Sequence, residues 1–332
     1  MLHIYRRVKT YAGWLRAHSQ NHDALIAAHA AQLENVLRRE QVNLLVACTG
    51  GNVHNLPAAY LAAQRLGIPL IVYIFDYYSR EMFAEQFVAR KWEERILRSA
   101  AALIVNNEGQ RDAYRQLYNL ESVVVYNPCA LDFPPASPDS HLVKGAFNIV
   151  YTGSLWRIHH DAFHRLAQAV NALGDKVYLH VFSSNPSFIL RSQGVDGPQI
   201  ILHAPLPPDE VRQVQREADL LVLAFSFDKT FEETLSTTLT TKLGEYLAAG
   251  RAILVHAPPA TFVNKYLRQR DSGVVVDQPD VAALTAALRN LVSDDALRAA
   301  LGQRARICAE ADFDSQKISA RFAQVIEQVS SP

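Results

Sequence analysis

This sequence has few cysteines, no net charge and no long apolar run, and each shortage excludes a class of protein. Its three cysteines lie far apart and form neither a disulfide framework nor a CxxC metal motif, so we expect a reducing, cytoplasmic environment. The 33 Lys and Arg residues balance the 33 Asp and Glu residues. Because a general nucleic-acid binder needs a basic excess, we expect no nucleic-acid partner.

The most apolar stretch, residues 58–74, contains Gln64, Arg65, Gly67 and Pro69 and is short for a span of the bilayer. The basic N-terminus has no apolar core of the kind found in signal peptides. Neither segment therefore predicts a membrane-spanning or secreted protein.

Residues 1–22 contain four Lys or Arg residues and no Asp or Glu, with apolar and aromatic residues interleaved at helical spacing. This pattern predicts a short basic amphipathic helix. Two interpretations stay open: the helix lies on an anionic membrane surface, or it packs on the protein and its basic side faces water. In the first case the protein contacts the inner face of the membrane peripherally.

After a helix expected at 23–39, short runs of Val, Ile and Leu alternate with helical patterns. The expected strands are residues 43–48, 70–75, 101–105 and 122–125, and the helices between them are 57–66, 81–99 and 108–117. Continuous apolar strands separated by helices indicate a parallel sheet that is covered on both faces. The predicted fold class is therefore α/β.

A segment rich in proline and serine, residues 131–145, interrupts this alternation and is typical of an interdomain linker. The alternation then begins again, with strands expected at 147–151, 177–182, 200–202, 220–224, 252–255 and 273–276. Two such domains enclose a cleft, where ligands commonly bind. The predicted domains are residues 1–136, on which a helix at about 315–330 packs, and residues 137–314.

One candidate motif, Tyr-Thr-Gly-Ser-Leu-Trp-Arg, follows the first strand of the second half. Gly153 and Ser154 lie between an expected strand and an expected helix, where backbone amides can face an anion. Arg157, His159 and His160 in the same loop are candidates to neutralise phosphate charge, or are ordinary surface side chains. The sequence has no GxGxxG, which argues against a nicotinamide-dependent dehydrogenase.

The strongest signal is a threonine-rich helix start, Ser-Thr-Thr-Leu-Thr-Thr-Lys-Leu-Gly-Glu-Tyr-Leu-Ala-Ala-Gly, directly before a strand. Thr238, Thr240 and Thr241 supply hydroxyls and amides where the helix macrodipole is positive. Lys242 follows in the first turn, beside a bound phosphate, and Glu245 is placed to accept two hydrogen bonds from a sugar diol. The alternative is an ordinary capped helix in which Lys242 pairs with Glu245.

Together these segments resemble the family 4-like glycosyltransferases of the GT-B fold. The run Lys-Leu-Gly-Glu-Tyr-Leu-Ala-Ala-Gly-Arg-Ala-Ile-Leu-Val is similar to the family's donor-site helix and the strand after it. Four further segments resemble family motifs in the same order, namely residues 92–106, 150–154, 217–223 and 280–306. The resemblance implies two Rossmann-like domains facing each other across a cleft, and a retaining, metal-independent transfer of a sugar from a nucleotide-diphosphate sugar.

Carried over by position, the resemblance implies that Glu245 binds the donor ribose as the second Glu of the family's E-x7-E motif. The first Glu of that motif falls at Thr237, so a carboxylate contact to the sugar is missing or comes from Glu232 or Glu233. The positions whose backbone amides meet the diphosphate and the sugar are Leu239, Thr240 and Thr241.

The family's basic pair maps near Ser154 and His160, so Arg157 and Lys242 are expected to substitute for it. In the first domain, Phe75-Asp76 stands where many relatives have His-Asp, which retains Asp76 and loses the histidine. His54, after a Gly-Gly turn, is the candidate to stand in for that histidine. The family's first strand and its Gly-Gly loop are not found, so we expect an abbreviated N-terminal domain.

The leading hypothesis is a hexosyltransferase of bacterial surface polysaccharide synthesis, with UDP or GDP in its donor and a glycan or lipid-linked acceptor. No cofactor or metal is expected, because Asp312-Phe-Asp314 is interpreted as a helix start. Two alternatives stay open. A non-catalytic sugar-nucleotide-binding partner subunit would explain Thr237 and the missing Gly-Gly loop, and a sugar-nucleotide epimerase of the same fold would need acid–base carboxylates in the cleft.

Overall fold

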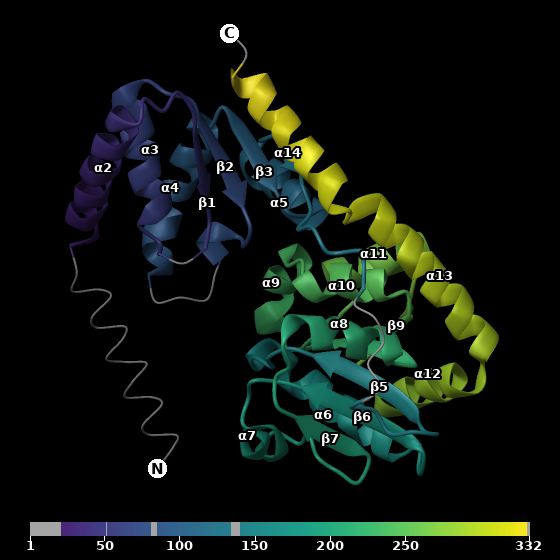
Figure 1. Ribbon diagram of the computed structural model, residues 1–332. Helices are drawn as coiled ribbons and strands as arrows, with labels where there is room; N and C mark the ends of the chain where they lie inside the picture. Colours follow the sequence, from purple (N-terminus) through teal and green to yellow (C-terminus); the bar gives the residue numbers. More distant parts are fainter. Residues whose placement is uncertain (1–20, 51, 81–84, 134–139, 331–332) are drawn as a thin grey trace. The chain divides into compact units, whose positions relative to one another are not determined.

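The computed structural model describes residues 21–50, 52–80, 85–133 and 140–330, and the chain divides into two compact units (Figure 1). The first unit comprises Met1–Tyr126 and Ala320–Pro332, and the second comprises Asn127–Ser319. The amphipathic helix predicted at the N-terminus lies almost wholly outside the described residues. None of the described helices is long and apolar enough to cross a membrane.

The first unit is built on a four-stranded parallel sheet in the order β1-β2-β3-β4 (Figure 1). Its strands are β1 (Leu45–Cys48), β2 (Leu70–Ile74), β3 (Ala102–Val105) and β4 (Val123–Val124). Its helices are α2 (His22–Arg39), α3 (Asn55–Leu66), α4 (Gln86–Ser99) and α5 (Glu108–Tyr118), with a 3-10 turn, η1 (Tyr78–Arg80). Every residue of β2 is buried, as expected for a strand with neighbours on both sides and helices above and below.

Local capping groups explain where several of these helices begin and end. The Asn21 side chain accepts a hydrogen bond from the Ala24 amide at the start of α2, and Asn107 does the same for Gln110 at the start of α5. Gly67 ends α3 in the left-handed conformation, with φ of 69°, which favours a residue without a Cβ.

The second unit contains a six-stranded parallel sheet in the order β10-β9-β8-β5-β6-β7. Its strands are β5 (Phe147–Thr152), β6 (Val177–Phe182), β7 (Ile200–His203), β8 (Leu220–Ala224), β9 (Ala252–His256) and β10 (Val274–Val276). The chain first moves outward from β5 to β7 and then continues on the other side of β5 with β8. The strand order therefore reverses between β5 and β8, and ligands of doubly wound sheets bind outside the carboxyl ends at such a point.

Helices lie on both sides of this sheet (Figure 1). They are α6 (His160–Asn171), α7 (Ser187–Ser192), α8 (Pro208–Glu217), α9 (Glu232–Thr237), α10 (Thr241–Ala249), α11 (Phe262–Arg270), α12 (Val281–Ser293) and α13 (Asp295–Asp312), with 3-10 turns η2 (Arg157–His159) and η3 (Lys229–Phe231). Their apolar faces bury a continuous core with the strands, in which Ile149, Leu166 and Leu254 are inaccessible to solvent. The predicted α/β class with two Rossmann-like units is confirmed.

The segment at 131–145 belongs to the second unit, although its composition predicts a linker between units. Arg306 donates a hydrogen bond from Nη1 to the Leu131 carbonyl at 2.7 Å, and the Arg216 guanidinium lies over the Phe133 ring. Proline and serine content reports on backbone conformation and not on such side-chain contacts. The chain therefore leaves the first unit at Tyr126 and returns to it at Ala320 within α14 (Ser315–Ser330).

Candidate functional site

A cavity of about 290 Å³ lies in the second unit at the carboxyl ends of β5, β6 and β7. The loops after these strands and the first turns of α10 form its walls. Five residues predicted from the sequence line it, namely Gly153, Ser154, Thr241, Lys242 and Glu245. The fold thus brings together two motifs that are more than eighty positions apart along the chain.

Gly153 shapes one wall because its backbone has a φ of 125°, a conformation that residues with a Cβ rarely adopt. A Cβ at this position would lie 2.3 Å from Cε of Lys242. Glycine therefore allows the lysine side chain to lie directly against the loop. The next residue, Ser154, joins this loop to the one after β6 through a 2.7 Å hydrogen bond between its hydroxyl and that of Ser184.

Lys242 brings an unmatched positive charge to the cavity. Its ammonium lies 5.5 Å from the centre of the Tyr151 ring and forms no hydrogen bond or ion pair with any residue that the structure describes. Burial lowers the pKa of Lys242, and the nearby carboxylate of Glu245 partly opposes that shift. The Lys242–Glu245 ion pair of the alternative interpretation does not form, so the ammonium can attract a bound anion.

The start of α10 adds backbone donors beside this lysine. Thr240 is the N-cap residue in an extended conformation, and its side chain makes no capping hydrogen bond. The first amides of an α-helix have no acceptor within the helix, and the macrodipole makes this end positive. Gly153, Lys242 and the start of α10 therefore form one electropositive wall.

The other threonine side chains of the motif serve their own helix. The Thr237 hydroxyl donates to the Glu233 and Thr234 carbonyls, and the Thr238 hydroxyl donates to the Thr234 carbonyl at 2.7 Å. Thr237 is 3% exposed and, like Thr238 and the buried Leu239, does not line the cavity. These hydrogen bonds lie at the end of α9 and occupy both hydroxyls. The groups that this motif offers at the start of α10 are therefore backbone groups.

The basic residues of the loop after β5 have three different environments. Arg157 is exposed, with its guanidinium 5.9 Å from the centre of the Phe231 ring, and His160 is the first residue of α6. Neither lines the cavity. His159 is buried and accepts a hydrogen bond from the Trp156 amide, and burial lowers its pKa to about 4. His159 is therefore neither an exposed surface side chain nor charged near neutral pH, and it does not fit the role of neutralising phosphate.

Glu245 lies between this cavity and a neighbouring one of about 270 Å³ that Cys129, Arg212 and Gln215 also line. Its Oε2 accepts a hydrogen bond from Nε2 of Gln215 at 3.2 Å. Sequence analysis missed Gln215. The available signal was a polar residue next to Val214 on the buried face of α8.

The first-unit candidates lie on loops at one edge of the four-stranded sheet. Thr49, directly after β1, donates from its hydroxyl to the Asp76 carbonyl at 3.1 Å and accepts from the Phe75 and Asp76 amides. It thereby joins the loop after β1, which leads to His54, to the loop after β2. Asp76 is exposed at this edge.

His54 is buried among other histidines. Its Nε2 lies 2.7 Å from Nδ1 of His22, and its ring centre lies 6.1 Å from that of His29. Burial and the two neighbouring histidines lower the pKa of His54. This environment disfavours the charged form of the imidazole.

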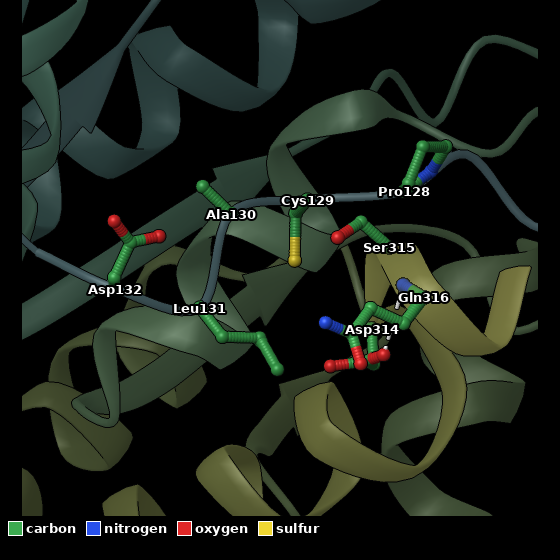
Figure 2. Close-up of a pocket in the computed structure, with 8 residues that line it drawn as sticks. All are labelled: Pro128, Cys129, Ala130, Leu131, Asp132, Asp314, Ser315 and Gln316. Carbon is green, nitrogen blue, oxygen red and sulfur yellow. Dashed lines mark hydrogen bonds between the residues drawn. The ribbon is translucent and has the colours of Figure 1, made fainter. Parts of the chain in front are cut away.

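A larger cavity of about 540 Å³ in the second unit also has Cys129 in its lining (Figure 2). Here the backbones of Cys129 and Asp314 form a single parallel β-bridge. Burial raises the pKa of the Cys129 thiol to about 12, so it is not a thiolate nucleophile. Asp314 accepts hydrogen bonds from the Gln316 and Lys317 amides, which confirms the predicted helix start. In the described part of the chain, no three His, Cys, Asp or Glu side chains gather as a metal site.

Family comparisons assign this architecture. Residues 146–294 match the family described as glycosyl transferases group 1, and residues 5–130 match the glycosyl transferase 4-like domain. The chain belongs to the family 4-like glycosyltransferases of the GT-B fold. No curated protein matches the sequence significantly.

Solved structures share the fold over most of both chains. A sucrose-phosphate synthase from Thermosynechococcus elongatus has a TM-score of 0.72 and 14% identity, and the match covers 90% of this chain and 77% of that one. HepE from Anabaena in complex with UDP-glucose has a TM-score of 0.69 and 17% identity, with 91% and 82% covered. A UDP-forming trehalose-phosphate synthase from Burkholderia xenovorans has a TM-score of 0.68 and 13% identity, with 97% and 80% covered. At these identities the likeness establishes the fold.

The resemblance predicts that the first Glu of the E-x7-E motif falls at Thr237. The hydroxyl of Thr237 donates a hydrogen bond within its own helix. Glu232 and Glu233, the residues considered as replacements, are exposed in the first turn of α9 and do not line the cavity.

Proposed function

We propose that the protein is a retaining, metal-independent hexosyltransferase that takes its sugar from a UDP- or GDP-sugar and transfers it to a glycan or lipid-linked acceptor. The proposed setting is bacterial surface polysaccharide synthesis at the cytoplasmic face of the membrane. The observation that carries the proposal is the unpaired ammonium of Lys242 beside Gly153 and the start of α10.

The chemistry of the reaction explains why this wall supports the proposal. Breaking a sugar–phosphate bond leaves negative charge on the departing diphosphate, and preorganised amides and cations stabilise that charge. Lys242 and the first amides of α10 supply such groups without a metal ion. Glu245, one turn further along α10, is placed to accept hydrogen bonds from the ribose diol.

The choice of donor base rests on the solved relatives. HepE was solved with UDP and with UDP-glucose, and the Burkholderia enzyme is described as UDP-forming. The acceptor side of the proposal rests on Asp76 and His54 in the first unit. A carboxylate and an imidazole on two loops that Thr49 joins are groups that suit the handling of an acceptor hydroxyl.

A thermal-shift panel of UDP, GDP, ADP, CMP and TDP tests the donor site, because a ligand that binds only the folded protein raises its melting temperature. We expect one diphosphate to stabilise the wild type and Lys242→Ala to abolish most of that shift. Lys144→Ala, at an exposed lysine of the same unit, is the matched control. No shift with any nucleotide would overturn the proposal.

A second candidate function is a non-catalytic sugar-nucleotide-binding subunit, favoured by the hydrogen-bonded Thr237 in place of a glutamate. Release of nucleoside diphosphate from UDP- and GDP-sugars, with and without membranes and acceptors, separates the two. Binding without turnover under all these conditions would favour the subunit.

A further inference from the structure

Gln215 lies between the two motifs of the donor cavity. It belongs to the last turn of α8, and no part of it is accessible to solvent. Its Nε2 donates to Thr152 Oγ1 at 3.0 Å and to Glu245 Oε2 at 3.2 Å. The Gln215 amide group therefore joins the end of β5, directly before Gly153, to the Glu245 carboxylate on α10.

The chemistry of its two partners determines how this amide is oriented. An ionised carboxylate only accepts hydrogen bonds, so the NH₂ group and not the carbonyl of Gln215 must face Glu245. The Gln215 carbonyl oxygen is buried and has no hydrogen-bond partner among the residues that the structure describes. An unsatisfied buried carbonyl lowers the free energy of unfolding. In this orientation, however, both amide hydrogens of Gln215 are used in hydrogen bonds.

A second contact reinforces the same connection. The Tyr246 hydroxyl accepts a hydrogen bond from the Thr152 amide at 2.9 Å. Residues 245 and 246 are thus both bonded, directly or through Gln215, to Thr152. Tyr246 ties the helix backbone to the strand, whereas Gln215 contacts the carboxylate itself.

We propose that Gln215 is a positioning residue that holds the Glu245 carboxylate in the orientation that receives the ribose diol. This inference rests on the proposed nucleotide-sugar function. Gln215 occupies one oxygen, Oε2, and restricts rotation of the carboxylate, which leaves Oε1 to accept from the ligand with little entropy to lose. Affinity gained in this way depends on the ribose hydroxyls and not on the base or the phosphates.

The test measures dissociation constants of UDP and 2′-deoxy-UDP, and of GDP and 2′-deoxy-GDP, for the full chain by calorimetry. Gln215→Met removes the amide while keeping the size of the side chain. We expect it to weaken ribonucleotide binding about fivefold and deoxyribonucleotide binding less than twofold, as for one lost hydrogen bond. Gln213→Met is the matched control, because Gln213 lies on the same helix and its side chain donates to Glu217 within that helix.

A double-mutant cycle separates positioning from general stabilisation of the fold. If Gln215 acts through Glu245, Gln215→Met should have no further effect on binding in a Glu245→Gln background. In turnover assays the single variant should raise the KM for the donor and leave kcat within about twofold.

The outcomes distinguish the two proposals. If the wild type binds neither nucleotide pair, the proposed function fails and this inference with it. If the wild type binds but Gln215→Met weakens both members of a pair equally, or acts additively with Glu245→Gln, only the positioning role is overturned.

Discussion

Glu93 in the first unit and Lys242 in the second are charged side chains with opposite environments. In the first unit Glu93 is fully buried, and its carboxylate accepts hydrogen bonds from the Ser79 amide and from the hydroxyls of Tyr114 and Tyr118. In the second unit Lys242 faces a cavity with no such partner among the described residues. A satisfied charge holds loops in place, whereas an unsatisfied one is available to a ligand.

The comparison explains why the donor site is easier to recognise than the acceptor side. The wall around Lys242 consists of backbone amides and one cation from the start of α10, packed against Gly153, and two short motifs supply all of these groups. The first-unit candidates depend on pairings between separate elements, such as His22 with His54. We therefore expect perturbations to affect the two units differently.

The largest expected effect is a loss of stability of the second unit in acid. Burial lowers the pKa values of His159, His180 and His256 there to about 4, whereas an unfolded histidine titrates near 6.5. Between these values the unfolded chain binds more protons, so the free energy of unfolding falls as pH falls, by up to about 3 kcal/mol per histidine. Hydrogen exchange at pH 7 and 5 should show the second sheet losing protection before the first.

A variant tests the source of that acid sensitivity. Nε2 of His256 accepts a hydrogen bond from Nε of Arg165 at 3.1 Å, which a protonated ring cannot do. His256→Gln should reduce the decrease in the free energy of unfolding between pH 6.5 and 4.5. His164→Gln, at an exposed histidine, should leave that decrease unchanged. Earlier loss of the first sheet would contradict this account.

Next in size is the effect of removing the unpaired cation on turnover. Lys242→Met keeps the length of the side chain and removes the charge that faces the departing diphosphate. We expect kcat for sugar transfer to fall about 100-fold, the effect of deleting one transition-state donor. Lys144→Met is the control. An unchanged kcat in Lys242→Met would show that Lys242 does not stabilise the transition state.

A smaller loss is expected for the ribose contact. Glu245→Gln should weaken nucleoside diphosphate binding by about 1–3 kcal/mol, as for a lost charged hydrogen bond. Calorimetry checks this, with Glu210→Gln on the exposed side of α8 as the control. If the folded Glu245→Gln variant binds nucleoside diphosphate with unchanged affinity, Glu245 does not contact the ribose.

The smallest expected effect concerns the first unit. Asp76→Ala or His54→Ala should leave nucleotide affinity unchanged and lower sugar transfer about tenfold, near 1.4 kcal/mol of barrier. Asp76 is exposed, so its replacement does not disturb the core. If turnover occurs and neither variant slows it, other residues handle the acceptor.

Much of the fold could be predicted because the signals are local. Apolar runs bounded by glycine and proline mark most strands to within two residues, and β6 and β8 lie where the sequence places them. The role of the 131–145 segment could not be predicted, because its assignment depends on contacts such as that of Leu131 with Arg306.

The same division applies to the candidate site. Gly153, Lys242 and Glu245 were identified from motifs, and one cavity brings them together. Gln215 was missed because nothing in the sequence of α8 shows that its amide meets both Thr152 and Glu245. The burial of His159 could not be predicted, because a histidine in a loop has no sequence mark of burial.

The sequence by itself determined the parallel α/β architecture and the helix start at Thr241, since both follow from hydrophobic period and from residues adjacent along the chain. Only the tertiary structure decided which polar groups are available to a ligand. The Thr237 hydroxyl is bonded to its own helix, whereas the Lys242 ammonium has no hydrogen bond within the part of the chain that the structure describes. That difference arises because burial and hydrogen-bond satisfaction depend on neighbours that the fold brings from distant parts of the chain.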